Sequence, residues 1–452
     1  MKVDRQTASP RPASKVRGRS GEAVVNSLSA VLTLVRTGIA STRQEIERES
    51  ELGRAVVADR LAILTGLDLV DESELGAASG GRAPRLVRFN ADIGRVLVAT
   101  LDQTALGVGI ADLDGHLLME HHEAIDLASD PSLILNRLIA LFEWVLEKHQ
   151  NRKPVWGVGL SVPGPVAMVE GADFLCRTPE FMPGWEGFPF VERLLVHFNA
   201  PVWMRSSVET MTMGELKAGG GVGQQTMLFI KVGTRIGAGI AVNGTVYRGA
   251  QGAAGLIGQI PVATVAGSPT LEAAAGSTAI AAAATTAALS GQSPYLADTL
   301  DRLGEITAID VGQAAQMGDS IATELLSKSG RLIGETVAAL TNMINPALIV
   351  LGGSAAQTSD TILAAVREAV YRNSHPLVTR DLRILRSQMG SSAGLVGAAA
   401  VVTEQIFSTA TLRGWITQGS VLDHSGFQDA LDAANQRLAA VPTRPQPPAP
   451  TA

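Results

Sequence analysis

The sequence predicts a mixed α/β protein in which a small helical domain with a short strand pair precedes a larger domain of two similar α/β halves. Three observations predict this class. Segments with helical spacing of apolar residues fill positions 21–90. From Val96 onward, strand-like apolar segments end in Gly-rich turns and alternate with helices. The same order of segments begins again near Met227, which indicates two related lobes.

Length, composition and charge narrow this class. A chain of 452 residues is too long for one core, and 46% hydrophobic residues supply apolar surface for several. Residues 1–90 hold 14 Lys or Arg and 11 Asp or Glu, whereas the rest of the chain holds 23 and 32. The basic excess near the N-terminus is typical of a module that faces phosphates.

Cysteine usage and hydropathy argue against several other classes. The single cysteine, Cys176, excludes an internal disulfide framework and a multi-cysteine zinc site. The basic N-terminus leads into no apolar segment, and the Ala-rich stretch 273–289 reads as a buried helix instead of a membrane span. We expect a cytoplasmic protein without a metal, a cofactor or membrane association.

Residues 39–89 carry the pattern of a winged helix-turn-helix. Thr42, or Ser41, is a natural N-cap, and Glu45 stands where a capping-box carboxylate reaches back. A break at 51–53 separates this helix from a second one at 54–64. A polar hairpin whose tip is Gly80-Gly81-Arg82 then forms a wing. A first helix at 22–36 packs beneath these elements.

This pattern favours DNA binding, with the second helix in the major groove and the wing along the backbone or minor groove. The expected DNA contacts come from the two helices and the wing. They are Thr42, Arg43, Arg54, Ala55, Val57, Arg60, Arg82 and Arg85. A helical protein-interaction domain is the alternative, because Glu47 and Glu51 stand where helix-turn-helix proteins usually carry a small residue and a glycine.

The element order after residue 95 predicts a two-lobed, actin-like fold of the sugar-kinase type, with ribonuclease H-like lobes. A strand pair at 96–118, a helix at 133–148 and a strand at 156–166 begin the first lobe. Six segments are expected. They are a disordered basic tail (1–20), the winged helix-turn-helix (21–90), the first lobe (91–206), the second lobe (207–390), C-terminal helices that return to the first lobe (391–440) and a disordered Pro-rich tail (441–452).

Several motifs in a fixed order carry a family resemblance over nearly the whole chain. They are SGGRAPRL, GLSVPGPV, PGWEGFPF, the Gly237-Ala-Gly239 turn with NGTVYRGAQGAAG, LEAAAGS, NPALIVLGG and GSSAGLVGAAA. In these motifs the chain resembles the ROK family of bacterial repressors and sugar kinases. It is most similar to the winged-helix repressor branch related to xylose and N-acetylglucosamine repressors. The resemblance implies the two-lobed ATPase fold and a role in transcription.

The resemblance also identifies departures from the family's kinases. Their Asp-x-Gly-Gly-Thr loop, which admits ATP phosphates, lacks its glycines in the stretch 102–106 here. Ser207 takes the position of the general-base Asp, and a serine hydroxyl cannot accept that proton at neutral pH. Glu209, two residues on, faces another direction. Arg235 interrupts the second phosphate turn, where it either occupies a phosphate position or is solvated. We therefore expect no catalytic residue and no enzyme activity.

The sugar site is altered as well. The family's Glu-x-Gly-His is Leu256-Ile-Gly-Gln259 here, and the stretch 266–270 replaces its zinc-binding cysteines, so the resemblance implies no zinc. Glu272 matches a family glutamate, and Gln259 can replace one hydrogen bond of the missing histidine. The expected effector-binding residues are Ser206, Ser207, Gln259 and Glu272.

Together these features predict a transcriptional regulator of carbohydrate metabolism genes, a repressor by the family's default. It would bind operator DNA as a homo-oligomer, a dimer or a tetramer, and sense a carbohydrate or a derivative. Two alternatives stay open. One is a regulator that has lost sugar sensing and responds to a protein partner. The other is an active sugar kinase, which the missing glycines and the missing Asp disfavour.

Overall fold

The computed structural model describes residues 19–76, 85–150, 152–169, 172–175, 182–265 and 267–440. The expected tails before residue 19 and after residue 440, the wing tip with Arg82, and Cys176 lie outside these ranges. The chain forms two compact units. One contains residues 1–93 and 406–428, and the other contains residues 94–405 and 429–452.

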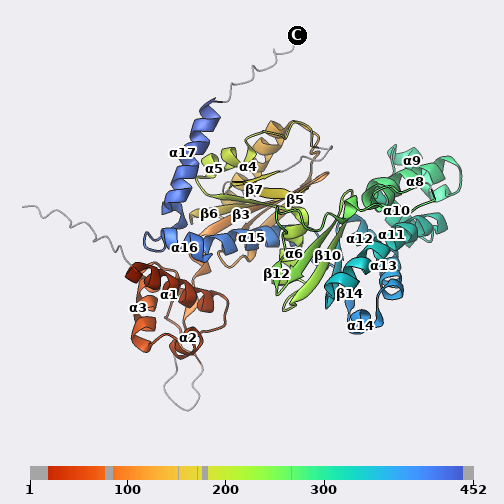
Figure 1. Ribbon diagram of the computed structural model, residues 1–452. Coiled ribbons are helices and arrows are strands. Elements are labelled where there is room, and N and C mark those ends of the chain that lie inside the picture. The colour runs from red at the N-terminus through yellow and green to blue at the C-terminus, as the bar shows by residue number, and fades with distance from the viewer. Residues whose placement is uncertain are drawn as a thin grey trace, which may run out of the picture. The chain divides into compact units, whose positions relative to one another are not determined.

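The first unit begins with three helices and a small antiparallel sheet (Figure 1). The helices are α1 (Arg19–Arg36), α2 (Arg43–Ser50) and α3 (Arg54–Gly66). The sheet pairs β1 (Val70–Asp71) with β2 (Arg88–Phe89), and a short 3-10 helix, η1 (Ala91–Ile93), follows. Two helices across a tight turn are the arrangement of a helix-turn-helix, and paired strands follow them.

Local signals position the helix-turn-helix as the sequence predicts. Thr42 is the N-cap of α2, its side chain accepts a hydrogen bond from the Glu45 backbone N–H, and Glu45 completes the capping box. On α3, Val57 and Leu61 are completely buried. Val56 is 37% exposed, because it lies on the outer face of the helix.

The turn between α2 and α3 has a left-handed residue. Glu51 ends α2 with φ 57° and ψ 18°. A side chain with a Cβ costs about 1–2 kcal/mol in this conformation, whereas glycine adopts it freely. The position where helix-turn-helix proteins usually carry glycine therefore keeps its glycine-type backbone here.

A C-terminal segment completes the core of the first unit. It contains α16 (Thr409–Trp415), the 3-10 helix η3 (Val421–Asp423) and the start of α17 (Ser425–Ala440). Trp415 is fully buried, and its Nε1 donates to the carbonyl of Ile406 at 3.0 Å. The ring of Phe407 makes edge contacts with Phe89 at 5.4 Å and with Trp415 at 5.9 Å.

The expectation that residues 391–440 return to the first lobe as one block is therefore wrong for 406–428. Aromatic side chains of this segment fill the apolar core of the N-terminal unit instead. The preceding helix, α15 (Ser392–Ile406), does pack on the first lobe. A Cβ at Gly159 would lie 2.6 Å from the carbonyl oxygen of Ala398, so the strand and the helix approach more closely than larger residues allow.

The second unit contains two five-stranded sheets with the same strand pattern, as the sequence predicts. The first sheet has the order β5-β4-β3-β6-β9. Its strands are β3 (Arg95–Asp102), β4 (Ala105–Ala111), β5 (Leu117–Ala124), β6 (Val155–Val162) and β9 (Val202–Ser206). Around it are α4 (Pro131–Lys148), α5 (Phe190–Phe198) and the hairpin of β7 (Val166–Val169) and β8 (Ala172–Leu175).

The second sheet has the order β12-β11-β10-β13-β14. Its strands are β10 (Thr226–Val232), β11 (Ile236–Val242), β12 (Thr245–Val246), β13 (Leu348–Gly352) and β14 (Arg383–Arg386). In both sheets, three antiparallel strands continue into two parallel ones. This repeat confirms the two-lobed α/β architecture.

Helices surround the second sheet. They are α6 (Ser207–Ala218), η2 (Ile257–Gln259), α7 (Leu271–Ala275), α8 (Ser277–Leu289), α9 (Pro294–Leu303), α10 (Ala308–Gln316), α11 (Ser320–Ile344), α12 (Ser354–Thr358), α13 (Asp360–Asn373) and α14 (Pro376–Thr379). Helix α6 contacts strands of both sheets.

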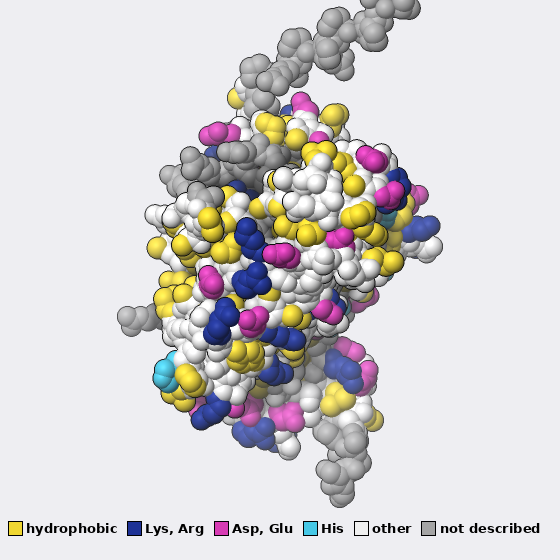
Figure 2. Space-filling view, turned by 90° about the vertical axis from the view of Figure 1, so that its right-hand side faces the viewer, with side chains coloured by type: hydrophobic (Ala, Val, Ile, Leu, Met, Phe, Trp, Pro, Cys, Tyr) yellow, Lys and Arg dark blue, Asp and Glu magenta, His cyan; other side chains and the backbone are white. Residues whose placement is uncertain are grey.

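On the face in Figure 2, acidic and basic side chains are interspersed and form no patch of one charge.

In the described part of the chain, no single helix is long and apolar enough to cross a membrane. Two bent helix pairs meet the length and composition together. One pair joins 271–289 to 294–303, and the other joins 392–406 to 409–415.

The left-handed turn residue gives a stability prediction. Glu51→Gly should raise the melting temperature of the first unit, because glycine removes a steric cost of about 1 kcal/mol. The matched control is Glu49→Gly, which places glycine inside α2 and should destabilise the unit by about 1 kcal/mol. Scanning calorimetry of both variants checks this. A lower melting temperature for Glu51→Gly would contradict the role of the turn.

Candidate functional site

Some arginines of the first unit form ion pairs with carboxylates of the same unit, and others do not. The Nε of Arg43 donates to Glu72 at 3.0 Å, and Arg88 pairs with Glu74 at 2.7 Å. Arg60 pairs with the neighbouring Asp59, and its Nε donates to the hydroxyl of Ser27 on α1 at 2.7 Å. Its side chain is only 12% exposed. Arg60 therefore joins α3 to α1, and we no longer assign it to DNA.

Two arginines of this unit have no side-chain partner among the described residues. Arg54 opens α3 and is exposed, and Arg85 is exposed on the strand side of the wing, where it forms a β-bridge with Leu75. Ala55 is exposed beside Arg54. The start of α3 thus presents an unpaired cation and a small side chain to solvent.

Two other residues expected to contact DNA are buried or serve as a helix cap. Val57 is completely buried, so the expectation that it contacts DNA is wrong; it faces the core because it lies one helical turn from Leu61. The Thr42 hydroxyl serves as the N-cap of α2, and only part of the residue is exposed.

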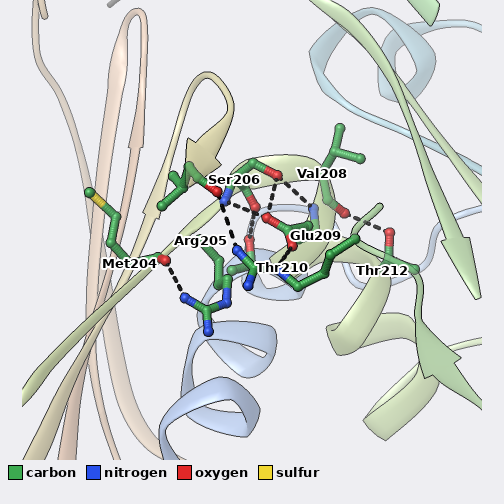
Figure 3. A network of polar contacts seen from close by, with 9 residues as sticks. Met204, Arg205, Ser206, Val208, Glu209, Thr210 and Thr212 are labelled. Atoms are coloured by element: carbon green, nitrogen blue, oxygen red, sulfur yellow. Dashed lines mark hydrogen bonds and ion pairs between the residues drawn. The ribbon is translucent and has the colours of Figure 1, made fainter. Parts of the chain in front are cut away.

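In the second unit, Ser206 and Glu209 lie at the start of α6 (Figure 3). Ser206 is its N-cap, and the Glu209 Oε2 accepts from the Ser206 N–H at 3.1 Å and from its hydroxyl at 3.0 Å. Arg248 donates through Nε to the other oxygen, Oε1, at 2.6 Å. Both carboxylate oxygens of the buried Glu209 are therefore engaged, and Glu209 is not available as a base.

Ser207, the second expected effector residue, faces a buried lysine. Nζ of Lys231, at the end of β10, donates to the Ser207 hydroxyl at 3.2 Å and to Oδ2 of Asp102 at 3.1 Å. The Lys231 side chain is 7% exposed, and that of Asp102 is 51% exposed. One ammonium thus joins the end of β3, the end of β10 and the first turn of α6.

Lys231 also changes the acidity of Asp102. The surrounding protein desolvates the carboxylate, which raises its pKa, but the Lys231 ammonium and the backbone N–H of Gln103 lower the pKa by more. The net pKa of Asp102 lies below its ordinary value. The carboxylate therefore stays charged at any pH near neutrality.

The other two expected effector residues form a second cluster. Glu272 is at the start of α7, and its Oε1 accepts from Nε2 of Gln259 at 2.6 Å and from Arg235 at 2.9 Å. The Arg235 side chain, 44% exposed, is thus paired with Glu272. No side-chain hydrogen bond between described residues joins this cluster to Ser206 or Ser207.

The residues in the described ranges include no group of three or more His, Cys, Asp or Glu side chains placed to hold a metal ion. Ala266, in the stretch that replaces the zinc motif, lies outside these ranges, and its neighbours in the motif carry no imidazole, thiolate or carboxylate.

Sequence reasoning did not assign a role to Lys231 or Arg248. A signal for Lys231 was present, because it is the one charged residue in the apolar strand 227–232. A charge in a fully buried strand needs a partner, so its presence predicts a polar contact. Arg248 follows a Gly-rich turn, where an arginine is normally solvated, so no comparable signal existed.

The fold and these sites define a class of protein: a helix-turn-helix unit and a two-lobed α/β domain in which several polar side chains bond to one another. The sequence model of the ROK family matches residues 102–405. The chain belongs to the ROK family.

The chain is similar both to repressors and to sugar kinases. A xylose repressor from Caldicellulosiruptor bescii is 25% identical over 392 residues, which cover 85% of this chain and 96% of the repressor. A glucokinase from Halalkalibacterium halodurans is 31% identical over 264 residues, 57% of this chain and 79% of the kinase.

Solved structures agree on the fold. A ROK family transcriptional regulator, a homolog of the Escherichia coli MLC protein, has a TM-score of 0.69 at 22% identity and covers 89% of this chain and 100% of its own. A ROK family glucokinase from Streptomyces griseus in complex with glucose and AMPPNP has a TM-score of 0.57 at 23% identity, over 68% of this chain and 99% of its own.

The lowered pKa of Asp102 predicts how its contribution to stability depends on pH. Because the folded-state pKa is below the unfolded value of about 3.9, the stabilisation is present at neutral pH and is lost as the pH falls through the folded-state pKa. The difference in melting temperature between wild type and Asp102→Asn should be constant from neutral pH down to about 5 and should shrink below about 3.9.

Thermal unfolding across this pH range measures the difference. Asp381→Asn is the control, because Asp381 is highly exposed and pairs only with its neighbour Arg380. It should leave the melting temperature nearly unchanged at neutral pH. A difference for Asp102→Asn that grows as the pH falls would contradict the assigned direction.

Proposed function

We propose that the protein is a ROK-family transcriptional repressor that binds operator DNA through its first unit and senses a carbohydrate, or a derivative, through its second. The observation that carries this proposal is the extent of the match to the xylose repressor. The match spans 392 residues, and only 359 residues follow Ile93. It therefore reaches into the helix-turn-helix unit, which a sugar kinase does not require.

The start of α3 is the proposed major-groove surface. Arg54 and Ala55 would face bases or phosphates there, while Arg43 and Arg85, with Arg82 at the wing tip, would contact the DNA backbone. Thr42 would contribute through its exposed part. A regulator that reads a near-palindromic operator would bind as a homodimer or as a tetramer, and would act in the cytoplasm where the DNA is.

A selection of genomic fragments by the purified full-length protein tests this proposal. An enriched near-palindrome, bound far more tightly than bulk DNA, is the expected result. Affinity that falls steeply with salt would report several phosphate contacts. Weak binding without enrichment, with and without a panel of sugars, would overturn the assignment as a DNA-binding regulator.

Arg54 gives the sharpest test of the DNA surface. Arg54→Ala should weaken operator binding by about 1–3 kcal/mol, roughly 5- to 150-fold, because an unpaired cation at the start of α3 is lost. The matched control is Arg48→Ala, since Arg48 is exposed on α2 and already pairs with Glu49. Fluorescence anisotropy with the selected operator checks both variants. Equal losses in the two variants would argue against α3 as the reading helix.

We further propose that the protein has no kinase activity. ATP-dependent phosphorylation of hexoses and aminosugars should be undetectable, because Ser207 replaces the base and both oxygens of Glu209 are engaged. Ser207→Asp alone should not create activity, because the first phosphate loop still lacks its glycines and Lys231 would pair with the new carboxylate. A coupled ADP-release assay with a ROK glucokinase as positive control measures this. Measurable turnover by the wild type would contradict it.

The effector class is tested by calorimetry against sugars and sugar phosphates. Glu272 keeps one carboxylate oxygen that accepts no hydrogen bond from a described side chain, and Gln259 is exposed beside it. Saturable binding that Glu272→Gln weakens supports sugar sensing at this cluster. No binding across the panel would favour a regulator that responds to a protein partner.

A further inference from the structure

Two cations of the second lobe reach the first turn of α6, and each also reaches the first lobe. Lys231 donates to the Ser207 hydroxyl at 3.2 Å and to Asp102 at the end of β3 at 3.1 Å. Arg248 follows β12; its Nε donates to Glu209 at 2.6 Å and its guanidinium donates to the carbonyl of Val166 at 3.2 Å. Ser207 and Glu209 are the first and third residues of α6. Each of the two cations therefore bonds both to the first turn of α6 and to the first lobe.

The packing around Arg248 shows that the approach of the lobes at Val166 is close. Gly252, four residues after Arg248, has φ 71°, and a Cβ at this position would collide with the carbonyl oxygen of Val166. That same carbonyl accepts the hydrogen bond from Arg248. The backbone of Gly252 thus lies against Val166, beside the hydrogen bond from Arg248 that joins the lobes.

Burial of the Lys231 ammonium opposes folding, because the charge loses hydration. A lysine at 7% exposure loses most of its hydration, and an apolar residue of similar size is often neutral or more stable there. The bonds that offset this cost run to Asp102 across the lobes and to Ser207 on α6. The lysine is therefore satisfied only when the ends of β3 and β10 lie together.

The contact between Lys231 and Asp102 joins two turns of the chain. Asp102 opens the stretch 102–106, which matches the first phosphate loop of the family's kinases, and Lys231 lies two residues before the second, at 233–237. In this chain the two turns are connected by a protein ammonium. The contact between the two turns is thus made by side chains of the protein itself.

We propose that Lys231 and Arg248 form a two-cation bridge that fixes the arrangement of the lobes in the absence of a nucleotide. Both are positioning residues, since they act through α6 and the ends of strands. The proposal rests on the two-lobed domain and is independent of DNA binding. An effector that changes the angle between the lobes has to break one of these bonds, whereas an effector that keeps the angle leaves them intact.

Double electron-electron resonance measures the distance between the lobes in the full-length protein. Spin labels are placed at Leu118 on β5 and at Leu303 on α9, which are 40% and 51% exposed, in a Cys176→Ser background. Labelled protein is diluted with unlabelled protein so that distances between subunits do not contribute. Tryptophan fluorescence and thermal unfolding confirm that each variant is folded.

The double variant Lys231→Met with Arg248→Met should shift the distance between the lobes and broaden its distribution, with smaller changes in each single variant. The matched control is Lys328→Met with Arg372→Met, which removes one exposed lysine and one exposed arginine from the second lobe alone. This control should keep the wild-type distribution. An unchanged distribution in the folded double bridge variant would overturn the proposal.

Asp102→Asn keeps the experiment decisive if the loss of Lys231 prevents folding. This change leaves the shape of the side chain intact and removes only the charge that faces Lys231. It should by itself broaden the distance distribution relative to wild type. Where Lys231→Met folds, combining the two changes should add nothing further, because they break the same bond. Additive effects, or no effect of Asp102→Asn, would show that Lys231 does not act through Asp102.

Discussion

A charge in a strand that is buried on both faces needs a partner, and this constraint organises the centre of the two-lobed domain. Lys231 is the only charged side chain of β10, and its partners lie on another strand and on a helix start. The ammonium therefore restricts three elements at once. Because α6 contacts both sheets, the restriction extends from the strand ends to both lobes. Apolar packing alone would tolerate small shifts that these directed bonds do not.

The groups that a kinase would offer to its substrates are largely used inside this protein. Ser206 and Glu209 cap a helix, Ser207 accepts from a lysine, and Glu272 accepts from Arg235 and Gln259. A ligand at these residues must exchange such bonds for its own, and a hydrogen bond to a charged group contributes about 1.5–3 kcal/mol.

The sequence predicted what local chemistry determines and failed where distant segments meet. The capping box of Thr42 and Glu45 follows from spacing within a few residues, and it was correct. The bond of Lys231 to Asp102 spans 129 positions, and no local pattern specifies which carboxylate it meets. Val57 was misassigned because a small helical residue looks the same from either face until the neighbouring helices are known. The aromatic contact of Phe89 with Phe407 was beyond sequence reasoning for the same reason.

The discontinuous core of the first unit has a consequence for how the protein is made. Phe89 leaves the ribosome early, but Phe407 and Trp415, which complete its surroundings, are translated more than three hundred residues later. At about 5–20 residues per second, this delay is on the order of tens of seconds. A nascent or truncated chain thus carries its helix-turn-helix without the aromatic residues that complete the core. The chain acquires a finished N-terminal unit only when its sensing domain has already been synthesised.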